Sequence, residues 1–187
     1  MASPAVTRPR ATYEDLLAVP EHMVAEILDG ELFTHARPAL RHAGASSALG
    51  MKLGTRFHLG DGGPGGWWIL DEPELHLGED VVVPDLAGWR RERMAELPDE
   101  AFLTLAPDWV CEVIAPETER IDRGRKLRIY AAAAVRHAWL LNPLVRTLEV
   151  YRLENARWSV VGTFEGNGAV RAEPFDAIEL ELAQRWS

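Results

Sequence analysis

The sequence predicts an α/β fold in which one mixed β-sheet is flanked by helices. Apolar, β-branched runs separated by turn residues indicate strands, and two long stretches with helical apolar periodicity indicate helices. No linker or internal repeat divides the 187 residues, a length that fits one domain. We therefore expect one domain at residues 11–187, preceded by a short mobile tail at residues 1–10.

The N-terminal elements are indicated by a tight turn and a long amphipathic pattern. In order, we expect a short helix, a segment that fits either a strand or a helix, a strand and a long helix, at residues 13–17, 23–28, 31–34 and 40–59. Asp29-Gly30 is typical of a tight turn. The long helix predicts an apolar face near Leu40, Ala43, Leu49, Leu53 and Phe57.

The remaining elements follow a Gly-, Asp- and Pro-rich connection at residues 60–66, which lacks the Gly-Lys-Ser/Thr ending of a phosphate-binding loop. Seven strands are expected at residues 67–70, 74–77, 81–89, 108–114, 137–141, 147–153 and 158–164. A helix is expected at residues 121–134, and the charged segment 90–102 predicts short turns or an exposed loop.

The composition is that of a globular protein without a membrane segment. No apolar run approaches the roughly 20 residues that span a bilayer, and residues 1–10 lack the apolar core of a secretory signal. The single cysteine, Cys111, excludes an intramolecular disulfide and a cysteine-rich zinc site. These observations favour a cytoplasmic protein.

The charge balance is acidic, with 20 basic and 29 acidic residues and a net charge of −9. A protein that coats or packages nucleic acid needs a basic excess to neutralise phosphates, so that class is disfavoured. An enzyme needs only a local basic strip beside its site. The only lysines are Lys52 and Lys126, and lysine, unlike arginine, is a compact charge that can point at one oxygen.

Two acids occupy the ends of apolar strands. Asp85 follows Val81-Val82-Val83-Pro84, and the proline removes a backbone donor where the strand stops pairing. Glu112 interrupts an otherwise apolar strand, so it requires a cationic partner, a metal or a solvent-lined cleft. On neighbouring strands the two carboxylates could share a hard cation such as Mg²⁺. The alternative for each acid is a solvent-facing position at a strand end.

A polar stripe follows on the predicted helix, where Asp122, Lys126 and Tyr130 are spaced by four residues. The helix begins only a few residues after Glu112, so Lys126 could reach back over the acids. The alternative is an Asp122–Lys126 surface pair with Tyr130 partly buried beneath it.

These residues carry a resemblance to a known family. The stretches 83–86 and 107–118, followed by Asp122, Lys126 and Tyr130, resemble the Uma family of putative restriction endonucleases, a bacterial group in the PD-(D/E)XK nuclease superfamily. Segments 25–32 and 138–143, and Pro38 with His42, are similar as well. The resemblance extends from about Glu14 to Tyr151, and it is carried by the order and spacing of the motifs together.

The resemblance implies a restriction-endonuclease-like fold, with Asp85 and Glu112 as ligands of Mg²⁺ or Mn²⁺, Lys126 as the superfamily lysine and Glu26 as an additional acid. His42 is a candidate accessory residue that contacts a metal ligand or a phosphate, although it also fits an ordinary histidine at a helix N-terminus. Asp122 and Tyr130 are further accessory candidates.

The chain departs from the superfamily in two places. The superfamily lysine usually lies two residues after the glutamate, a position occupied here by Ile114, which shares a strand face with Glu112. The family pattern moves the lysine to the helix, where Lys126 fits. In the following loop, Ala115 and Glu117 replace the usual small polar residues.

The expected activity is metal-assisted hydrolysis of phosphodiester bonds in nucleic acid, with DNA favoured over RNA. One alternative is a catalytically degenerate nuclease fold that acts as a binding or assembly module, which the acidic charge and the relocated lysine favour. Another is a metal-dependent hydrolase of a small phosphorylated molecule. Trp158 and Trp186, expected at the surface, and a C-terminal strand series with an open edge suggest a homodimer.

Overall fold

A six-stranded mixed sheet forms the centre of the protein, for which the computed structural model describes residues 9–186. In spatial order its strands are β10 (Arg157–Glu165), β9 (Thr147–Glu154), β8 (His137–Asn142), β7 (Trp109–Val113), β6 (Leu86–Arg90) and β3 (Trp67–Asp71). The pair β7–β8 is parallel, and the other neighbours are antiparallel. The mixed sheet expected from the sequence is therefore present.

Two smaller sheets accompany it. A four-stranded sheet has the order β2 (Glu31–Ala36), β1 (Met23–Leu28), β5 (Asp80–Val82) and β4 (Leu75–Leu77), and a two-stranded sheet pairs β11 (Ala169–Val170) with β12 (Leu180–Glu181). Asp29 and Gly30 both have positive φ, 54° and 80°, as the tight turn between β1 and β2 requires.

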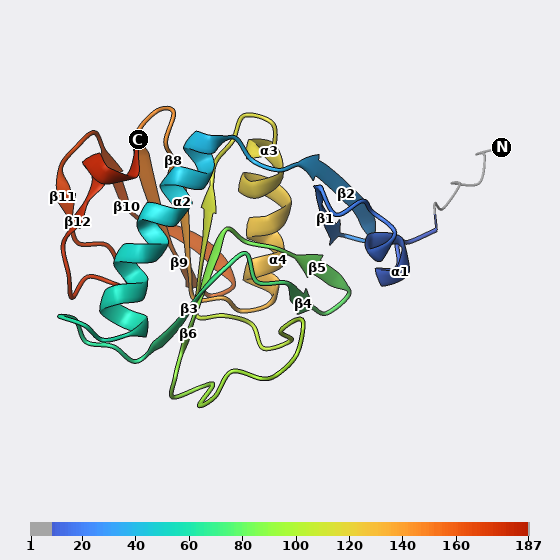
Figure 1. Ribbon diagram of the computed structural model, residues 1–187, viewed down its shortest axis with the longest axis horizontal. Coiled ribbons are helices and arrows are strands. Elements are labelled where there is room, and N and C mark those ends of the chain that lie inside the picture. The colour runs from blue at the N-terminus through green and yellow to red at the C-terminus, as the bar shows by residue number, and fades with distance from the viewer. Residues whose placement is uncertain (1–8, 187) are drawn as a thin grey trace.

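Helices cover both faces of the six-stranded sheet, with α2 on one side and the α3–α4 helix on the other (Figure 1). The helices are α1 (Tyr13–Leu17), α2 (Leu40–Leu53) with a π-helical turn at Gly54–His58, α3 (Glu119–Ile121), a second π-helical turn at Asp122–Lys126, α4 (Leu127–Ala132) and a C-terminal 3₁₀ turn at Leu182–Arg185. Along the described part of the chain, no helix has the length and apolar character needed to cross a membrane.

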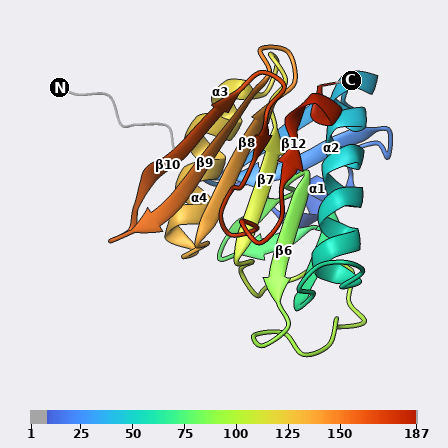
Figure 2. The same ribbon diagram turned by 90° about the vertical axis from the view of Figure 1, so that its left-hand side faces the viewer.

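Alternation along β7 separates two apolar cores. Trp109, Cys111 and Val113 pack on the side of α2, whereas Val110 and Ile114 pack on the side of α4. The core on the α2 side is closed by the C-terminal segment, which crosses this face of the sheet near α2 (Figure 2).

Three local expectations need correction. Leu40 is 92% exposed, and the buried face of α2 consists of Ala45, Ser46, Leu49 and Leu53, continued by Phe57. The strand expected at 81–89 is two strands, β5 and β6, separated by residues 83–85. The elements β11, β12 and the C-terminal 3₁₀ turn were not expected. The predicted mobile tail lies mainly outside the described residues.

Candidate active site

The sequence candidates meet at one cleft of about 450 Å³. It is lined by β1, the end of β2, the start of α2, the β5–β6 connection, the end of β7 and the segment that follows β7. Asp85, Glu112, Lys126, His42 and Asp122 line it. Glu26 and Tyr130 lie behind this lining and contact Lys126 and Glu112. The seven residues come from β1, α2, the β5–β6 connection, β7 and the helix that follows β7.

The strand β7 places Glu112 on the side of α4. Because Trp109, Cys111 and Val113 point to the opposite face, Glu112 shares its face with Val110 and Ile114. The side chain is 3% exposed. A carboxylate at this depth needs compensation, and the helix that follows β7 supplies it.

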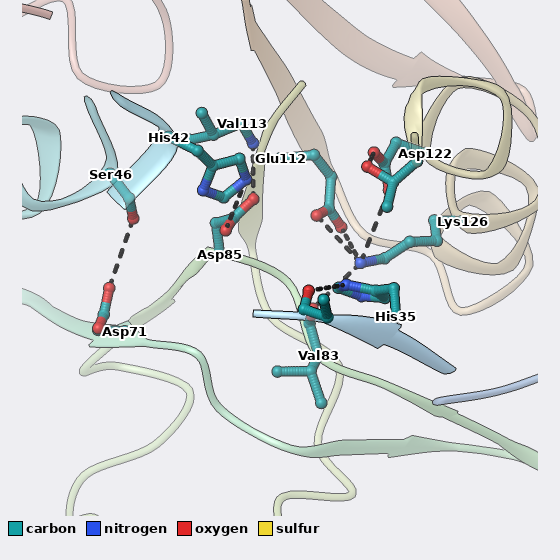
Figure 3. Close-up of polar contacts among 12 residues, drawn as sticks. His35, His42, Ser46, Asp71, Val83, Asp85, Glu112, Val113, Asp122 and Lys126 are labelled. Carbon is teal, nitrogen blue, oxygen red and sulfur yellow. Dashed lines mark hydrogen bonds and ion pairs between the residues drawn. The ribbon is translucent and has the colours of Figure 1, made fainter. Parts of the chain in front are cut away.

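Lys126 is the cation at the centre of the site (Figure 3). Its side chain is 4% exposed, and its Nζ lies 2.9 Å from Oε1 of Glu112 and 3.0 Å from Oε1 of Glu26. A third carboxylate, that of Asp122, is 3.9 Å away, and Nζ also donates to the Val83 carbonyl at 3.1 Å. Lys126 is therefore not the surface partner of Asp122 that the spacing alone allowed.

The helix reaches this position through an irregular turn. Residues 122–126 form a π-helical turn between α3 and α4, in which the Leu127 N–H donates to the Asp122 carbonyl. Asp122 is fixed at the start of this turn, where its carboxylate accepts a hydrogen bond of 2.8 Å from the Thr118 hydroxyl. One turn after Lys126, the Tyr130 hydroxyl donates to Oε1 of Glu112 at 2.5 Å.

The carboxylates outnumber the cation, and the pKa values reflect this. Burial raises the pKa of Glu112 well above its usual value, and Asp122, Asp85 and Glu26 add to the effect while Lys126 opposes it. Burial alone would lower the pKa of Lys126, but Glu112 and Glu26 outweigh it and raise that pKa well above the usual range. The contacts of Lys126 with Glu112 and Glu26 thus favour its charged ammonium form.

Asp85 is held from two sides. Pro84 interrupts the backbone pairing between β5 and β6, and there Oδ2 of Asp85 accepts a 2.7 Å hydrogen bond from the Val113 N–H. Nε2 of His42, on the first turn of α2, lies 3.3 Å from Oδ1. Burial lowers the pKa of His42, but the hydrogen bond and charge of Asp85, together with the Val113 backbone and Asp122, outweigh it, so the net pKa is raised.

The backbone of the β5–β6 break belongs to the site as well. The Val83 N–H donates to Oε1 of Glu26 at 2.7 Å, and the Val83 carbonyl accepts from Lys126. Sequence reasoning missed this contact, and it also missed Asp71 at the end of β3. The Asp71 carboxylate accepts a 3.5 Å hydrogen bond from Ser46 and has a pKa raised by burial and by Asp85. Only strand pairing reveals Asp71, because Asp71 is paired with Leu86, next to Asp85.

The donor set suits a hard divalent cation that keeps much of its water. Among residues 9–186, no group of three or more histidine, cysteine, aspartate or glutamate side chains is arranged to hold a metal ion. Mg²⁺ usually binds through one or two carboxylates, completed by water and substrate phosphates. Asp85 and Glu112 line one cleft and are the two carboxylates that fit that pattern.

Comparison with known proteins identifies the family and the fold. The sequence profile of Uma2, described as "Putative restriction endonuclease", matches residues 10–184. The fold is similar to the crystal structure of a "putative nuclease belonging to DUF820" from Anabaena variabilis ATCC 29413, with a TM-score of 0.76 and 18% identity over 94% of this chain and 97% of that chain. No match was found among curated proteins. Because the profile spans nearly the whole chain, the protein belongs to the Uma2 family of putative restriction endonucleases.

Proposed function

We propose that this protein is a nuclease that uses Mg²⁺ or Mn²⁺ to hydrolyse phosphodiester bonds, with DNA as the favoured substrate. The observation that carries the proposal is the convergence of Asp85, Glu112 and Lys126 on one cleft. Family membership and the similar fold support a nuclease. The role of each side chain is inferred from its position and chemistry.

Asp85 and Glu112 would hold the ion, which when bound would polarise the scissile phosphate and lower the pKa of an attacking water. Lys126 would donate to a phosphate oxygen as negative charge develops on it. His42 is a positioning residue, because it contacts Asp85 and fixes the orientation of that carboxylate. Glu26 and the Val83 carbonyl hold the ammonium group of Lys126 in place.

The direct test is cleavage by Asp85→Asn. Asparagine keeps the shape but loses the charge that holds a cation, so we expect Mn²⁺ affinity and Mn²⁺-dependent cleavage to fall by a factor on the order of ten to a hundred or more. Asp99→Asn, an exposed site outside the cleft, is the matched control and should behave like the wild type. Titration calorimetry with Mn²⁺ and cleavage of labelled DNA measure the two effects. Equal cleavage by Asp85→Asn and wild type would exclude Asp85 as a metal ligand.

A binding module is the second candidate, because Lys126 and Tyr130 engage both carboxylate oxygens of Glu112. If the wild-type protein binds nucleic acid but cleaves neither DNA nor RNA with Mg²⁺ or Mn²⁺, this function replaces the nuclease. Hydrolysis of small phosphate esters without cleavage of polynucleotides would instead indicate a small-molecule hydrolase.

We also propose that the protein forms a homodimer. The two tryptophans that suggested a dimer from the sequence do not support this proposal. Trp186 is 5% exposed, and Trp158 is partly buried with its Nε1 donating to the Leu127 carbonyl, so the expectation that both lie at the surface was wrong. The strand β10 does lie at the sheet edge, and Val160 on it is 58% exposed. We expect dimers in sedimentation velocity at micromolar concentration, and Val160→Glu should dissociate them. Sedimentation of the wild type as monomer alone would remove this proposal.

A further inference from the structure

We infer that the cleft takes a single-stranded stretch of polynucleotide, whose phosphates are held by Arg37 and Arg41. This inference rests on the proposed nuclease function and adds the class of substrate and the residues that contact it. Three features of the cleft carry it: the depth of the acids, the few cations at its mouth and the apolar character of its walls.

The first feature is depth. The side chains of Glu112 and Lys126 are 3% and 4% exposed, and that of Asp85 is 13% exposed. A phosphate that reaches ions on these carboxylates must enter the cleft, since metal–oxygen distances are only about 2.0–2.6 Å. A flexible single strand can fold its backbone into a cleft of about 450 Å³. A base-paired duplex holds its phosphates on a stiff cylinder, and bending it into the cleft costs energy.

The second feature is the charge at the mouth. Arg37 directly follows β2, Arg41 lies in the first turn of α2, and both line the cleft with exposed side chains. Among the residues that the structure describes, neither arginine forms an ion pair, and Arg37 donates to the Glu21 carbonyl at 3.2 Å. Many arginines elsewhere on the protein are paired, for example Arg93 with Asp108 at 2.9 Å. Arginines without a carboxylate partner beside the proposed hydrolytic site suit the phosphates of a substrate.

The number of such contacts is small. The exposed Glu72 and Glu117 line the same cleft, so a second phosphate backbone beside the first would meet repulsion. Duplex-binding proteins commonly make about 6–10 phosphate contacts. Two arginines on a chain of net charge −9 match a short, single-stranded contact instead.

The third feature is the aliphatic character of the cleft wall. Val24, Val83, Ile114, Pro116 and Leu144 line the cleft, and no phenylalanine, tyrosine or tryptophan is among the described residues that do so. The rim at Leu144 is rigid, because the Asn142 side-chain oxygen accepts hydrogen bonds from the Leu144 and Val145 N–H groups at 3.1 and 3.2 Å. Aliphatic walls can contact sugars and base faces, but they carry no pattern of donors and acceptors that distinguishes one base from another. The contact is therefore expected to be tolerant of sequence.

The test is the salt dependence of binding without metal, which separates it from cleavage. Fluorescence anisotropy in EDTA, from about 20 to 200 mM NaCl, would compare labelled oligothymidylate and oligouridylate of twelve nucleotides with a DNA duplex of equal length. Each phosphate contact to a single strand contributes about −0.7 to the slope of log K against log salt, so two contacts predict a slope of about −1.4. Arg37→Gln and Arg41→Gln should each reduce the size of this slope by about 0.7. Arg157→Gln, an exposed arginine on β10, is the matched control and should not change it.

Tighter binding of the duplex than of either single strand would overturn the inference, and so would slopes that stay unchanged in both cleft variants. Tighter binding of the thymidylate would identify single-stranded DNA as the ligand, and tighter binding of the uridylate would identify single-stranded RNA. Equal binding would mean that the cleft accepts both, and each of these three results supports the inference. Expected slopes from a protein that never cleaves would refute the nuclease proposal and leave the single-strand contact standing. If the protein cleaves DNA but the slopes are unchanged in both cleft variants, the nuclease proposal stands and the single-strand contact is refuted.

Discussion

Lys126→Ala is expected to reduce metal-dependent cleavage by a factor on the order of a hundred to a thousand, as when one stabilising donor is removed from an active site. It should also lower the free energy of unfolding by about 3–5 kcal/mol, because Glu112 and Glu26 would be left as buried carboxylates without their cation. Urea denaturation and cleavage assays with Mn²⁺ measure the two effects separately.

Lys126→Arg separates chemistry from stability. Arginine retains the positive charge, but its planar guanidinium replaces a compact ammonium that is enclosed by three carboxylates and the Val83 carbonyl. We expect this variant to be more stable than Lys126→Ala and to lose cleavage to a similar degree. Lys52→Ala, which removes the other lysine, should retain full activity. Full cleavage by Lys126→Arg would show that charge alone is needed and that our assignment of a directed donor is wrong.

Phe175→Ala should destabilise the protein by about 3–5 kcal/mol, the usual effect of truncating a buried aromatic side chain. Phe175 is 0% exposed, and its ring centroid lies 4.6–4.9 Å from those of Phe57, Trp67 and Trp109. It joins the C-terminal segment to α2 and to the sheet. Urea unfolding followed by tryptophan fluorescence measures the change, because two of the neighbouring rings are indoles.

The control for this substitution is Phe102→Ala. Phe102 is partly exposed and stacks on His76 at 3.8 Å, outside the large core clusters. Its loss should have a clearly smaller effect. Similar losses for the two variants would mean that the C-terminal segment does not stabilise the α2 face of the sheet in the way its packing indicates.

Much of the fold could be predicted because local patterns agree with the final packing. The apolar runs that became β3, β7, β8 and β9 contain buried residues, and the Asp29-Gly30 turn closes the first hairpin. Glu112 could be predicted as a site residue because a carboxylate inside an apolar strand requires a partner. Lys126 could be predicted as a candidate because the chain contains only two lysines.

The rest depends on contacts that are distant in the sequence. Val83 and Glu26 are 57 positions apart, and nothing local in either segment reveals their hydrogen bond. Periodicity assigned Leu40 to the core of α2, but Leu40 is the first residue of the helix and is 92% exposed. The segment after β10 has little regular structure, so its burial through Phe175 and Trp186 could not be read from a pattern.

The wide turn at residues 122–126 gives the helix a freedom that a regular helix lacks. An α-helix advances about 100° per residue, so one additional residue rotates everything after it by that angle relative to everything before it. Asp122 is the first residue of the turn and Lys126 is its last, and Tyr130 follows in α4. A helix of this kind can bring a catalytic side chain to a strand-borne acid from a new direction without any change in the sheet. Position 114 carries no charge, and its isoleucine belongs to the core at 2% exposure. The charge that faces Glu112 is thus carried by the helix and not by the strand.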